Sequence, residues 1–426
     1  MIGIEDALER ILGFVSVLEP ETKPIMDALG QVLAEDVYSD LDIPPLDNSA
    51  MDGYAVRAKD TTGAGERSPV KLKVVDELAA GYTTSTVVTP GTAIRIMTGA
   101  PIPEGADAVV QFEHTDEADT LTNAVAAPKD RAAPGKRKEV LIYRSVALGV
   151  NVRPAGEDIR RGELIVKKGA VIRPAEVGVL ASLGRATVSV IRRPKVAVLA
   201  TGDELVELGQ TLQRGQIHNS NSYSVGAQVL RYGGIPWLLG IARDREADLV
   251  AKIKQALEAD LLITTAGVSV GDYDMTKKVL AAEGEITFWL VRMKPGKPLA
   301  FGHIGKVPHL GLPGNPVSSM VALEQFGRPA ILKMMGKTSF RKPEVQAILH
   351  GKADNRDGRR CFYRAHVENQ RGQWHAYLTA NQSSGVLTSM SLANGLVVVP
   401  EDVSQVNDGD AVRVQMLDWT EEMYCS

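Results

Sequence analysis

Three carboxylates follow apolar segments in the second half of the sequence, at positions where acidic side chains can bind a cation. Glu204 comes shortly after the run KVAVLA, Asp244 after PWLLGIA, and Asp274 after DLLITT. Ligands of open α/β sheets bind beyond the carboxyl ends of the strands, and Mg²⁺ prefers one or two carboxylates together with substrate phosphates. Any one of these residues could instead cap a helix, but the three together predict a magnesium site.

Two further loops carry groups that bind anions. The run KPGKP places Lys294 and Lys297 on a stiff turn, since proline fixes φ and glycine lets a ligand approach the backbone. The run GLPGNPVS follows a strand-like segment and suits the start of a helix, with Asn315 at the cap and Pro316 at the first helical position. Free N–H groups at the start of a helix bind anions. These loops, beside the acidic residues, predict a site for a phosphate-bearing ligand.

The composition and the missing motifs argue against several classes of protein. The sequence has no Walker A motif, no G-x-G-x-x-G after a strand and no G-x-S-x-G, which disfavours P-loop hydrolysis, dinucleotide binding and an α/β-hydrolase. Its two cysteines, Cys361 and Cys425, disfavour a disulfide framework and a thiolate zinc site. The net charge of −4 disfavours a nucleic-acid partner, and no signal peptide or membrane-spanning run is recognisable. We expect a soluble, cytoplasmic enzyme.

The segment from 194 to 335 must position most of these residues, and it alternates between strand-like and helix-like patterns. Apolar runs separated by helices predict a parallel or mixed sheet that is covered on both faces. His303 and His309 lie at a spacing that matches no helical pair of metal ligands, so we treat both as structural. We expect strands at 195–200, 236–242, 260–265, 286–291, 299–304 and 309–312, and helices at 222–232, 249–257, 275–282 and from 316 onward.

The rest of the chain has other patterns, and its length of 426 residues suggests about three domains. Apolar residues recur every three or four positions from 4 to 18, which predicts one amphipathic helix that ends just before a proline. Short apolar runs between Gly- and Pro-rich turns predict a β-rich region over 28–150. After 336, short strands and turn signals at 394–395 (Asn-Gly) and 408–409 (Asp-Gly) suggest a small β domain.

A dense polar block, PPLDNSAMDGY, lies in the first half of the sequence. From chemistry alone, Asp52 before Gly53 is better explained as a turn aspartate than as a catalytic group. Seven runs between about 44 and 319 nevertheless occur together, in the order PLDNSAMDGYAV, RIMTGAPIPEGADAVV, NVRPAGEDI, VLATGDELV, GVSVGDYDMTKKVL, KPGKPLAFG and GLPGNPVSS. In content and order they resemble the molybdopterin molybdenumtransferase family, whose animal relatives are the C-terminal part of gephyrin.

The resemblance implies a multi-domain α/β plus β protein that forms an elongated homodimer. A central α/β domain with a mostly parallel sheet would have β-rich domains on either side. The α/β domain of one subunit would face the β-rich domain of the other. The implied domains are a discontinuous α/β linking domain (1–27, 43–50 and 148–193), a β-rich domain (28–42 and 51–147), an α/β molybdopterin-binding domain (194–335) and a C-terminal β domain (336–426).

The resemblance also implies an activity. The family takes adenylylated molybdopterin, removes AMP and inserts molybdate between the dithiolene sulfurs, with Mg²⁺ as cofactor. The adenylyltransferase of the same pathway is a further expected partner, and neither a nucleic acid nor a membrane is expected. Two alternatives remain open. One is the adenylyltransferase step itself, since related domains make the adenylylated intermediate, and the other is a scaffold role like that of gephyrin.

The family's site residues carry over position by position. The expected metal ligands are Asp274, Asp244 and Glu204. The expected catalytic residues are Asp52, Thr98, Asp158, Glu204, Asp244 and Asp274. The expected substrate-binding residues are Asn219, Ser269, Lys294, Lys297, Asn315, Ser318, Arg364 and Ser384.

The chain departs from the family pattern at two places. Ala266 and Gly267 stand where the family usually has two glycines. We expect the extra methyl group of the alanine to leave less room between the backbone and the pterin phosphate. Leu290 stands where some members have a lysine, and we expect Arg292 to supply that charge.

Overall fold

A computed structural model describes residues 1–118, 137–266 and 275–418. The chain divides into two compact units, each of which is described by itself. The first unit comprises Met1–Glu35, Gly169–Val177 and Thr187–Ser426, and the second comprises Asp36–Lys168 and Gly178–Ala186. The finer division into four domains stays a prediction.

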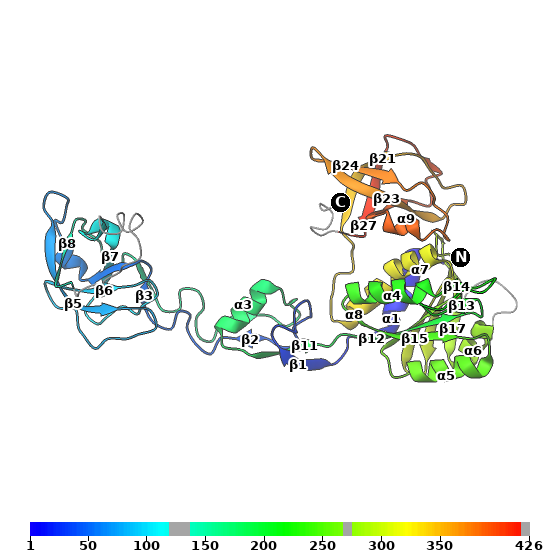
Figure 1. Ribbon diagram of the computed structural model, residues 1–426, viewed down its shortest axis with the longest axis horizontal. Coiled ribbons are helices and arrows are strands. Elements are labelled where there is room, and N and C mark those ends of the chain that lie inside the picture. Colours follow the sequence, from blue (N-terminus) through cyan, green and yellow to red (C-terminus); the bar gives the residue numbers. More distant parts are fainter. Residues whose placement is uncertain (119–136, 267–274, 419–426) are drawn as a thin grey trace. The chain divides into compact units, whose positions relative to one another are not determined.

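A six-stranded mixed sheet forms the centre of the first unit (Figure 1). Its first four strands run parallel, and the last two are antiparallel to their neighbours. A tight turn at Gly305, where φ is +60°, joins strands β19 and β20 and makes this pair antiparallel. In spatial order the strands are β15 (Ile235–Ala242), β12 (Lys195–Thr201), β16 (Leu261–Thr265), β20 (Val307–Leu312), β19 (Pro298–Ile304) and β17 (Glu285–Leu290).

Helices cover both faces of this sheet. Val196 and Val198 belong to one buried apolar cluster, and Ala197 and Leu199 belong to another, because successive strand residues point to opposite faces. The first cluster is covered by α1 (Ile4–Phe14), α4 (Ser220–Arg231), α7 (Pro316–Ala322) and α8 (Arg328–Met334), and the second by α5 (Glu246–Ala256) and α6 (Met275–Glu283).

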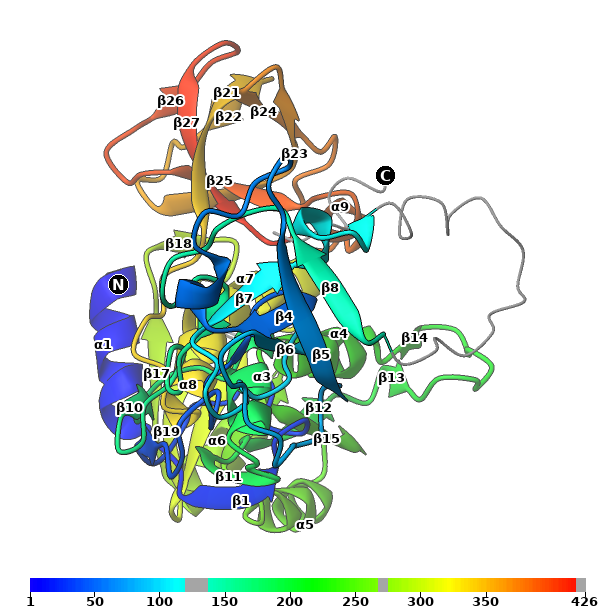
Figure 2. The same ribbon diagram turned by 90° about the vertical axis from the view of Figure 1, so that its left-hand side faces the viewer.

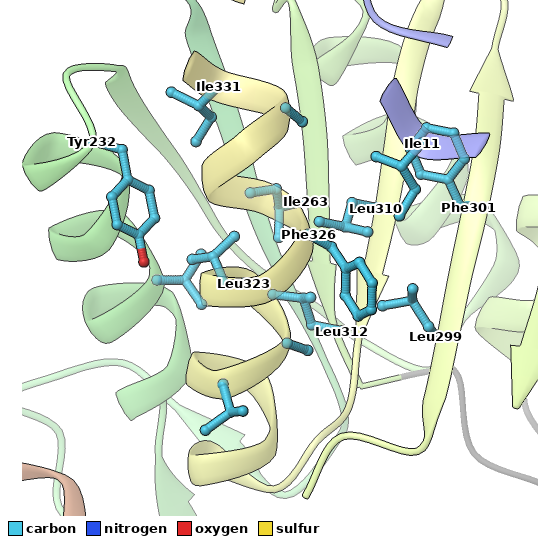
Figure 3. Packing of buried hydrophobic residues seen from close by; sticks show 14 of the residues in the cluster. Ile11, Tyr232, Ile263, Leu299, Phe301, Leu310, Leu312, Leu323, Phe326 and Ile331 are labelled. Atoms are coloured by element: carbon cyan, nitrogen blue, oxygen red, sulfur yellow. The ribbon is translucent and has the colours of Figure 1, made fainter. Parts of the chain in front are cut away.

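Figure 3 shows how the first cluster packs. A short π-helix, η3 (Leu323–Gly327), joins α7 to α8 and carries Leu323 and Phe326. Phe326 points toward Leu312 and Leu299 of the sheet, while Tyr232 lies at the end of α4 on the other side. Fully burying such a side chain stabilises the fold by about 1.5–3 kcal/mol. This packing holds the start of α7 against the sheet.

The first helix is shorter than the sequence predicted. Helix α1 ends at Phe14, and Val15 already has an extended backbone. The Leu18 N–H donates to the carbonyl of Met334, and the chain continues into β1 (Pro20–Pro24), which pairs antiparallel with β11 (Thr187–Ile191). Strand pairing needs an extended chain, and a residue that precedes proline also disfavours the helical region. Tertiary contacts therefore override the helical spacing after Phe14.

The residues after 343 form a second sheet in the first unit, as the sequence suggested. Its five long strands follow one another in space, and β25 pairs again with β23, so the sheet closes on itself. A short strand from the lysine loop, β18 (Met293–Lys294), adds to it in parallel with β23. The long strands are β21 (Glu344–His350), β23 (Arg360–Gln370), β24 (Gln373–Leu378), β25 (Gly395–Val399) and β27 (Ala411–Met416).

The Asn394–Gly395 pair, expected to mark a turn, does not form a hairpin turn. Gly395 is the first residue of β25 and pairs with Met416. The Asn394 side chain accepts a hydrogen bond from the Val367 N–H at 2.7 Å, and its amide donates to the Val367 carbonyl at 2.9 Å. The side-chain amide thus takes the place of a strand residue beside β23.

A five-stranded sheet forms the centre of the second unit, where the sequence predicted a β-rich region (Figure 2). Separate apolar clusters contain Tyr54 and the neighbouring Ala55, so both faces of the sheet are buried. A Cβ added at Gly53 would lie 2.0 Å from the Val110 carbonyl oxygen, so this close approach requires glycine. In spatial order the strands are β7 (Ala108–Gln111), β4 (Gly53–Val56), β6 (Thr92–Ile96), β5 (Val70–Leu78) and β8 (Glu139–Ile142).

Short elements complete the described ranges. Among those ranges, no helix is both long and apolar enough to cross a membrane. The short strand pairs are β3 (Asn48–Ser49) with β9 (Val152–Arg153), β2 (Val37–Tyr38) with β10 (Leu164–Val166), β13 (Leu205–Val206) with β14 (Ile217–His218), and β22 (Ala353–Asp354) with β26 (Gln405–Val406). The short helices are η1 (Ala58–Thr61), η2 (Phe112–His114), α3 (Pro174–Ser182) and α9 (Thr388–Ser391).

Candidate functional site

One cleft in the first unit gathers many of the predicted site residues. Its volume is about 880 Å³, and its walls come from the α/β sheet, the lysine loop, the start of α7 and the C-terminal sheet. A smaller cavity of about 390 Å³ shares wall residues with it and is lined by Asn219, the N-cap of α4. The predicted residues that line the large cleft are Glu204, Lys294, Lys297, Asn315, Ser318, Arg364 and Ser384.

The lysine loop forms one wall of this cleft. Lys294 pairs with Cys361 of β23, so the C-terminal sheet holds the start of the loop. The Lys297 carbonyl accepts a hydrogen bond from the Val291 N–H. At Gly296, φ is +102°, and an added Cβ would lie 2.9 Å from Met293 Cε, so glycine is needed where the loop turns. Both lysine side chains remain exposed at the cleft.

The start of α7 lies in the cleft, but it is less open than the sequence predicted. Asn315 is the N-cap residue, yet its side chain makes no capping hydrogen bond. Its Nδ2 instead donates to Ser384 Oγ at 3.1 Å, and the Val317 N–H donates to the Ser384 carbonyl at 3.1 Å. The N–H of Val317, which we expected to be free for an anion, is therefore occupied. Ser384 ties the C-terminal part to this helix.

Glu204 reaches the same cleft because a glycine leaves room for its carboxylate. Gly202 has φ of +138°, and an added Cβ would lie 2.4 Å from Oε2 and 2.7 Å from Oε1 of Glu204. The Glu204 carbonyl accepts a hydrogen bond from the Ile217 N–H. The TGDE run therefore has a physical reason for its glycine, since a side chain would displace the acid that follows.

Of the other two carboxylates of the predicted magnesium site, only Asp244 lies within the described residues. Asp244 is exposed at the end of β15, where its N–H donates to Asp203 Oδ1 at 3.2 Å, and it is not among the residues that line either cavity. Asp274 and the expected substrate-binding residue Ser269 lie outside the described residues. Convergence of three acids on one cation stays a prediction.

A magnesium ion implied by the resemblance can be tested against the groups present. Within the described ranges, no three His, Cys, Asp or Glu side chains group closely enough to hold a metal by themselves. Mg²⁺ is usually bound through one or two carboxylates, several waters and substrate phosphates rather than by an all-protein cage. Glu204, the one acidic residue among the described wall residues of the cleft, fits this kind of site.

Arg364 is the most deeply buried cation in the wall of the cleft, with 2% of its surface exposed. Its Nε donates to Ser389 Oγ at 3.3 Å, and its two terminal nitrogens each donate to a carbonyl at 3.4 Å, those of Phe362 and Ser383. Burial lowers the pKa of Arg364 to about 10, so it stays charged at neutral pH. A buried charge is costly unless it is paired. Arg364 is therefore suited to bind an anion.

The sequence analysis did not single out several residues that line the cleft, among them Arg359 and Gln382. Arg359 forms an ion pair with Asp357 and donates to the Met293 carbonyl at 3.4 Å. Burial raises the pKa of the Cys361 thiol to about 11, so it stays protonated at neutral pH. The polar run NQSSG holds no signal that singles out Gln382.

Three predicted catalytic residues lie in the second unit. Asp52 Oδ1 accepts hydrogen bonds from the Thr98 N–H at 2.7 Å and the Thr98 hydroxyl at 2.8 Å. Both residues are exposed, at the ends of strands β4 and β6. Asp158 is exposed as well, and its N–H donates to the Ile43 carbonyl. The contact between Asp52 and Thr98 joins two of the family motifs, and it also accounts for Asp52 as a turn aspartate.

Comparison with known proteins gives the identity of the family. The chain is 36% identical to molybdopterin molybdenumtransferase 2 of Mycobacterium tuberculosis, over 97% of this chain and 99% of that protein. This chain belongs to the molybdopterin molybdenumtransferase family. It is also 36% identical to the molybdopterin molybdenumtransferase of Haemophilus influenzae, over 97% of this chain and 98% of that one. The family resemblance predicted from the seven motifs is confirmed.

Solved structures and models of the family's regions agree with this membership. A crystal structure of the molybdopterin biosynthesis MoeA protein from Pyrococcus horikoshii matches with a TM-score of 0.81 and 34% identity, over 99% of this chain and 100% of that one. Three family models match, described as the MoeA N-terminal region (domain I and II) at residues 2–184, a probable molybdopterin binding domain at 197–333, and the MoeA C-terminal region (domain IV) at 346–417.

The two departures from the family pattern can be placed in the fold. Ala266, where a family glycine is expected, has φ of +72°, a left-handed conformation that glycine adopts without strain. It lines both cavities, and a Cβ added at Gly314 would lie 3.4 Å from its Cβ. Leu290 and Arg292 are exposed, and neither is among the residues that line the cleft. The expectation that Arg292 replaces a family lysine stays a prediction.

Proposed function

We propose that this protein inserts molybdate into adenylylated molybdopterin and releases AMP. The observation that carries the proposal is the gathering of seven predicted residues, from separate segments between 204 and 384, around one cleft. This cleft combines residues from the region that matches a probable molybdopterin binding domain with residues from the region that matches the MoeA C-terminal domain. Relatives of similar length are named molybdopterin molybdenumtransferases, which supports the same activity.

The charges that line the cleft suit a substrate with a pyrophosphate and a second, smaller oxyanion. Lys294 and Lys297 present two ammonium groups on one loop, and ammonium groups form strong hydrogen bonds with phosphate oxygens. Arg364 is a planar donor with no carboxylate among its described partners, beside Ser384. We assign the lysines to the phosphates and Arg364 with Ser384 to molybdate, a tetrahedral dianion.

The proposed reaction balances without a further reactant. As the two dithiolene sulfurs bind molybdenum, their two protons and one molybdate oxygen leave as water. Cleavage of the phosphoanhydride consumes one water, which adds to phosphorus as AMP departs. Two positive charges beside the anhydride stabilise the negative charge that develops on its oxygens. The sum converts adenylylated molybdopterin and molybdate into molybdenum cofactor and AMP.

Glu204 is the described residue that would hold Mg²⁺ in this cleft, and Asp274 is a second candidate outside the described residues. When bound, Mg²⁺ would neutralise charge on the pyrophosphate oxygens. The carboxylate of Glu204 also limits where anions can lie, because it repels any oxyanion that is not shielded by a cation. Glu204 and the two lysines of the same cleft would thus orient the pyrophosphate.

The activity can be measured with purified protein, adenylylated molybdopterin and molybdate. We expect the protein to release AMP and to produce a cofactor that activates an apo-molybdoenzyme. Lys297→Ala should lower kcat/KM by roughly tenfold or more, since a charge-assisted hydrogen bond contributes about 1.5–3 kcal/mol. Lys306→Ala, an exposed lysine at the turn between β19 and β20, is the matched control and should keep wild-type activity. Equal rates in both variants would contradict the lysine assignment.

The same assay distinguishes the proposed reaction from the adenylyltransferase step. A mixture of the protein with ATP and molybdopterin should leave ATP unchanged. Consumption of ATP with release of pyrophosphate, and no AMP release from the adenylylated substrate, would assign the protein to the earlier step and refute the proposal.

We further propose that Asp52, Thr98 and Asp158 act from the partner copy in a homodimer. Mixed dimers of an Asp52→Asn chain and a Glu204→Gln chain test this. If each site takes Asp52 from one chain and Glu204 from the other, one of the two sites stays intact and up to half of the activity returns. If both residues come from the same chain, every site has one defect, and no activity should return. Activity that does not return would refute the shared site.

A further inference from the structure

The loop that carries Gln382 lies against the main chain of Arg364. The Gln382 side-chain oxygen accepts a hydrogen bond from the Arg364 N–H at 3.0 Å, and its amide donates to the Arg364 carbonyl at 2.9 Å. The same amide donates to Thr379 at its carbonyl (2.8 Å) and hydroxyl (3.0 Å). Pairing between β23 and β24 runs as far as Ala365 and Leu378. The Thr379 N–H also donates to the Arg364 carbonyl at 2.9 Å, and Arg364 pairs with Leu396 of β25 on its other side, so Gln382 adds the last contacts on the β24 side of this residue.

The guanidinium of Arg364 depends on the same loop. One of its terminal nitrogens donates to the carbonyl of Ser383, the residue after Gln382. Its Nε donates to Ser389, whose hydroxyl donates in turn to the Val386 carbonyl at 2.7 Å. Both the main chain and the side chain of Arg364 are therefore held by the segment 379–389, which also reaches the start of α7 through Ser384.

The partners of Arg364 differ in kind from those of Arg359 in the same cleft. Arg359 is paired with the carboxylate of Asp357, which offsets its charge. Among the described residues, the partners of the Arg364 guanidinium are neutral oxygens, and no carboxylate contacts it. Neutral partners orient a guanidinium without cancelling its charge. The full charge of Arg364 thus remains available to an anion, provided that the neutral contacts keep it in place.

We propose that Gln382 is a positioning residue for oxyanion binding, which acts by holding Arg364 with its charge directed at the cleft. This inference rests on the proposed role of Arg364 in binding molybdate. The side chain of Gln382 is suited to the task because an amide has separate donor and acceptor atoms for the carbonyl and the N–H of one residue, whereas a carboxylate can only accept hydrogen bonds. It aligns the arginine before the anion arrives, so binding requires less ordering.

Molybdate binding to the full-length protein, measured by titration calorimetry, tests this role. Gln382→Met keeps the length of the side chain and removes the amide, and it should weaken molybdate binding by roughly tenfold, as expected for loss of two or more hydrogen bonds. In the turnover assay it should raise KM for molybdate and leave kcat at saturating molybdate within about twofold. Gln373→Met, an exposed glutamine on β24, is the matched control and should bind molybdate as the wild type does.

A double-mutant cycle separates positioning from a general loss of structure. If Gln382 acts through Arg364, then Gln382→Met should have little effect on molybdate binding in an Arg364→Ala background. Additive losses in the double variant would refute the inference. Wild-type thermal unfolding of each variant shows that it is folded, and Gln382→Ala provides a second test of the same cycle if the methionine variant does not fold.

The outcomes also separate this inference from the function on which it rests. If Arg364→Ala binds molybdate as tightly as the wild type, the assignment of Arg364 to molybdate is wrong. If Arg364→Ala loses binding but Gln382→Met and Gln382→Ala keep it, the assignment stands and the positioning role of Gln382 is refuted.

Discussion

Acidification should destabilise the first unit through the buried imidazole of His309. This residue lies on β20 with none of its surface exposed, and its Nε2 is 3.0 Å from Thr264 Oγ1. Among the described residues, its Nδ1 has no hydrogen-bond partner. Burial lowers the pKa of His309 from 6.5 to about 3, because a cationic imidazole would lose its hydration without gaining a counter-charge.

The size and sign of the effect follow from this pKa. Between about pH 3 and 6.5 the unfolded chain binds a proton that the folded chain does not, so stability rises with pH in this window. The contribution is complete above about pH 6.5 and is lost as the pH falls toward about 3. One pKa unit corresponds to about 1.4 kcal/mol. The free energy of unfolding should therefore fall by about 2 kcal/mol at pH 5 and by about 4 kcal/mol near pH 3 through this residue alone.

The variant His309→Gln isolates this contribution from that of other titrating groups. Urea unfolding at pH 7 and pH 5 gives the stability difference between variant and wild type at each pH. The tryptophans among the described residues, Trp237, Trp289 and Trp374, lie in the first unit, so their fluorescence reports on that unit. The variant should be less stable than the wild type at pH 7, where packing dominates. At pH 5 this difference in stability should be about 2 kcal/mol smaller. Only the wild type has a buried imidazole that stays unprotonated in the folded state and binds a proton in the unfolded state.

The control keeps the buried imidazole and changes its partner. Thr264→Val removes the hydroxyl next to Nε2 and leaves the burial that lowers the pKa of His309, so its deficit should be the same at both pH values. A stability difference between His309→Gln and the wild type that does not change with pH would refute the reasoning.

Two further predictions concern the backbone at the cleft. Gly202→Ala should lower kcat/KM, because the added Cβ would lie 2.4 Å from Glu204 Oε2 and displace the carboxylate. The control is Gly209→Ala, which should keep activity, since φ is positive there too, at +82°, but the added Cβ has no described atom within 4 Å. Equal rates in the two variants would contradict the role of Gly202. Ala266→Gly should raise the free energy of unfolding, measured in urea, by up to about 1 kcal/mol, since φ of +72° strains alanine. A loss of stability, which is the usual result of introducing glycine, would contradict the strain at this residue.

Much of the local structure could be predicted, because strand and helix patterns are properties of short segments. Each of the six central strands lies within two residues of its expected position, since apolar runs between turn residues are local signals. Helix α1 is the clear exception. Its apolar spacing continues past Phe14, but the chain leaves the helix to pair as β1. Pairing partners lie far away in the sequence, so no local pattern reports them.

The sequence named cleft residues where charge is concentrated, and it held no signal for contacts between distant segments. The lysine loop and Glu204 could be named from residue types and motifs, and Arg364 was named from the family resemblance; all of them line one cleft. The sequence could not show that the Val317 N–H donates to the Ser384 carbonyl. The start of a helix has the same sequence whether or not another segment covers it. Asp244 does not line the cleft in the described structure, and its place in a metal site stays a prediction, since a carboxylate at a strand end need not face the cleft.

The sequence by itself determined the family, the order of the elements and the residue types that can bind an oxyanion, because motifs and periodicity are contained in contiguous residues. Only the tertiary structure decided that the lysine loop and the arginine of β23 share one cleft, that the arginine keeps its charge among neutral oxygens, and that Gln382 holds it there. Such contacts depend on strand register and packing between distant segments. These contacts form only when the whole chain is folded, so no single segment of the sequence encodes them.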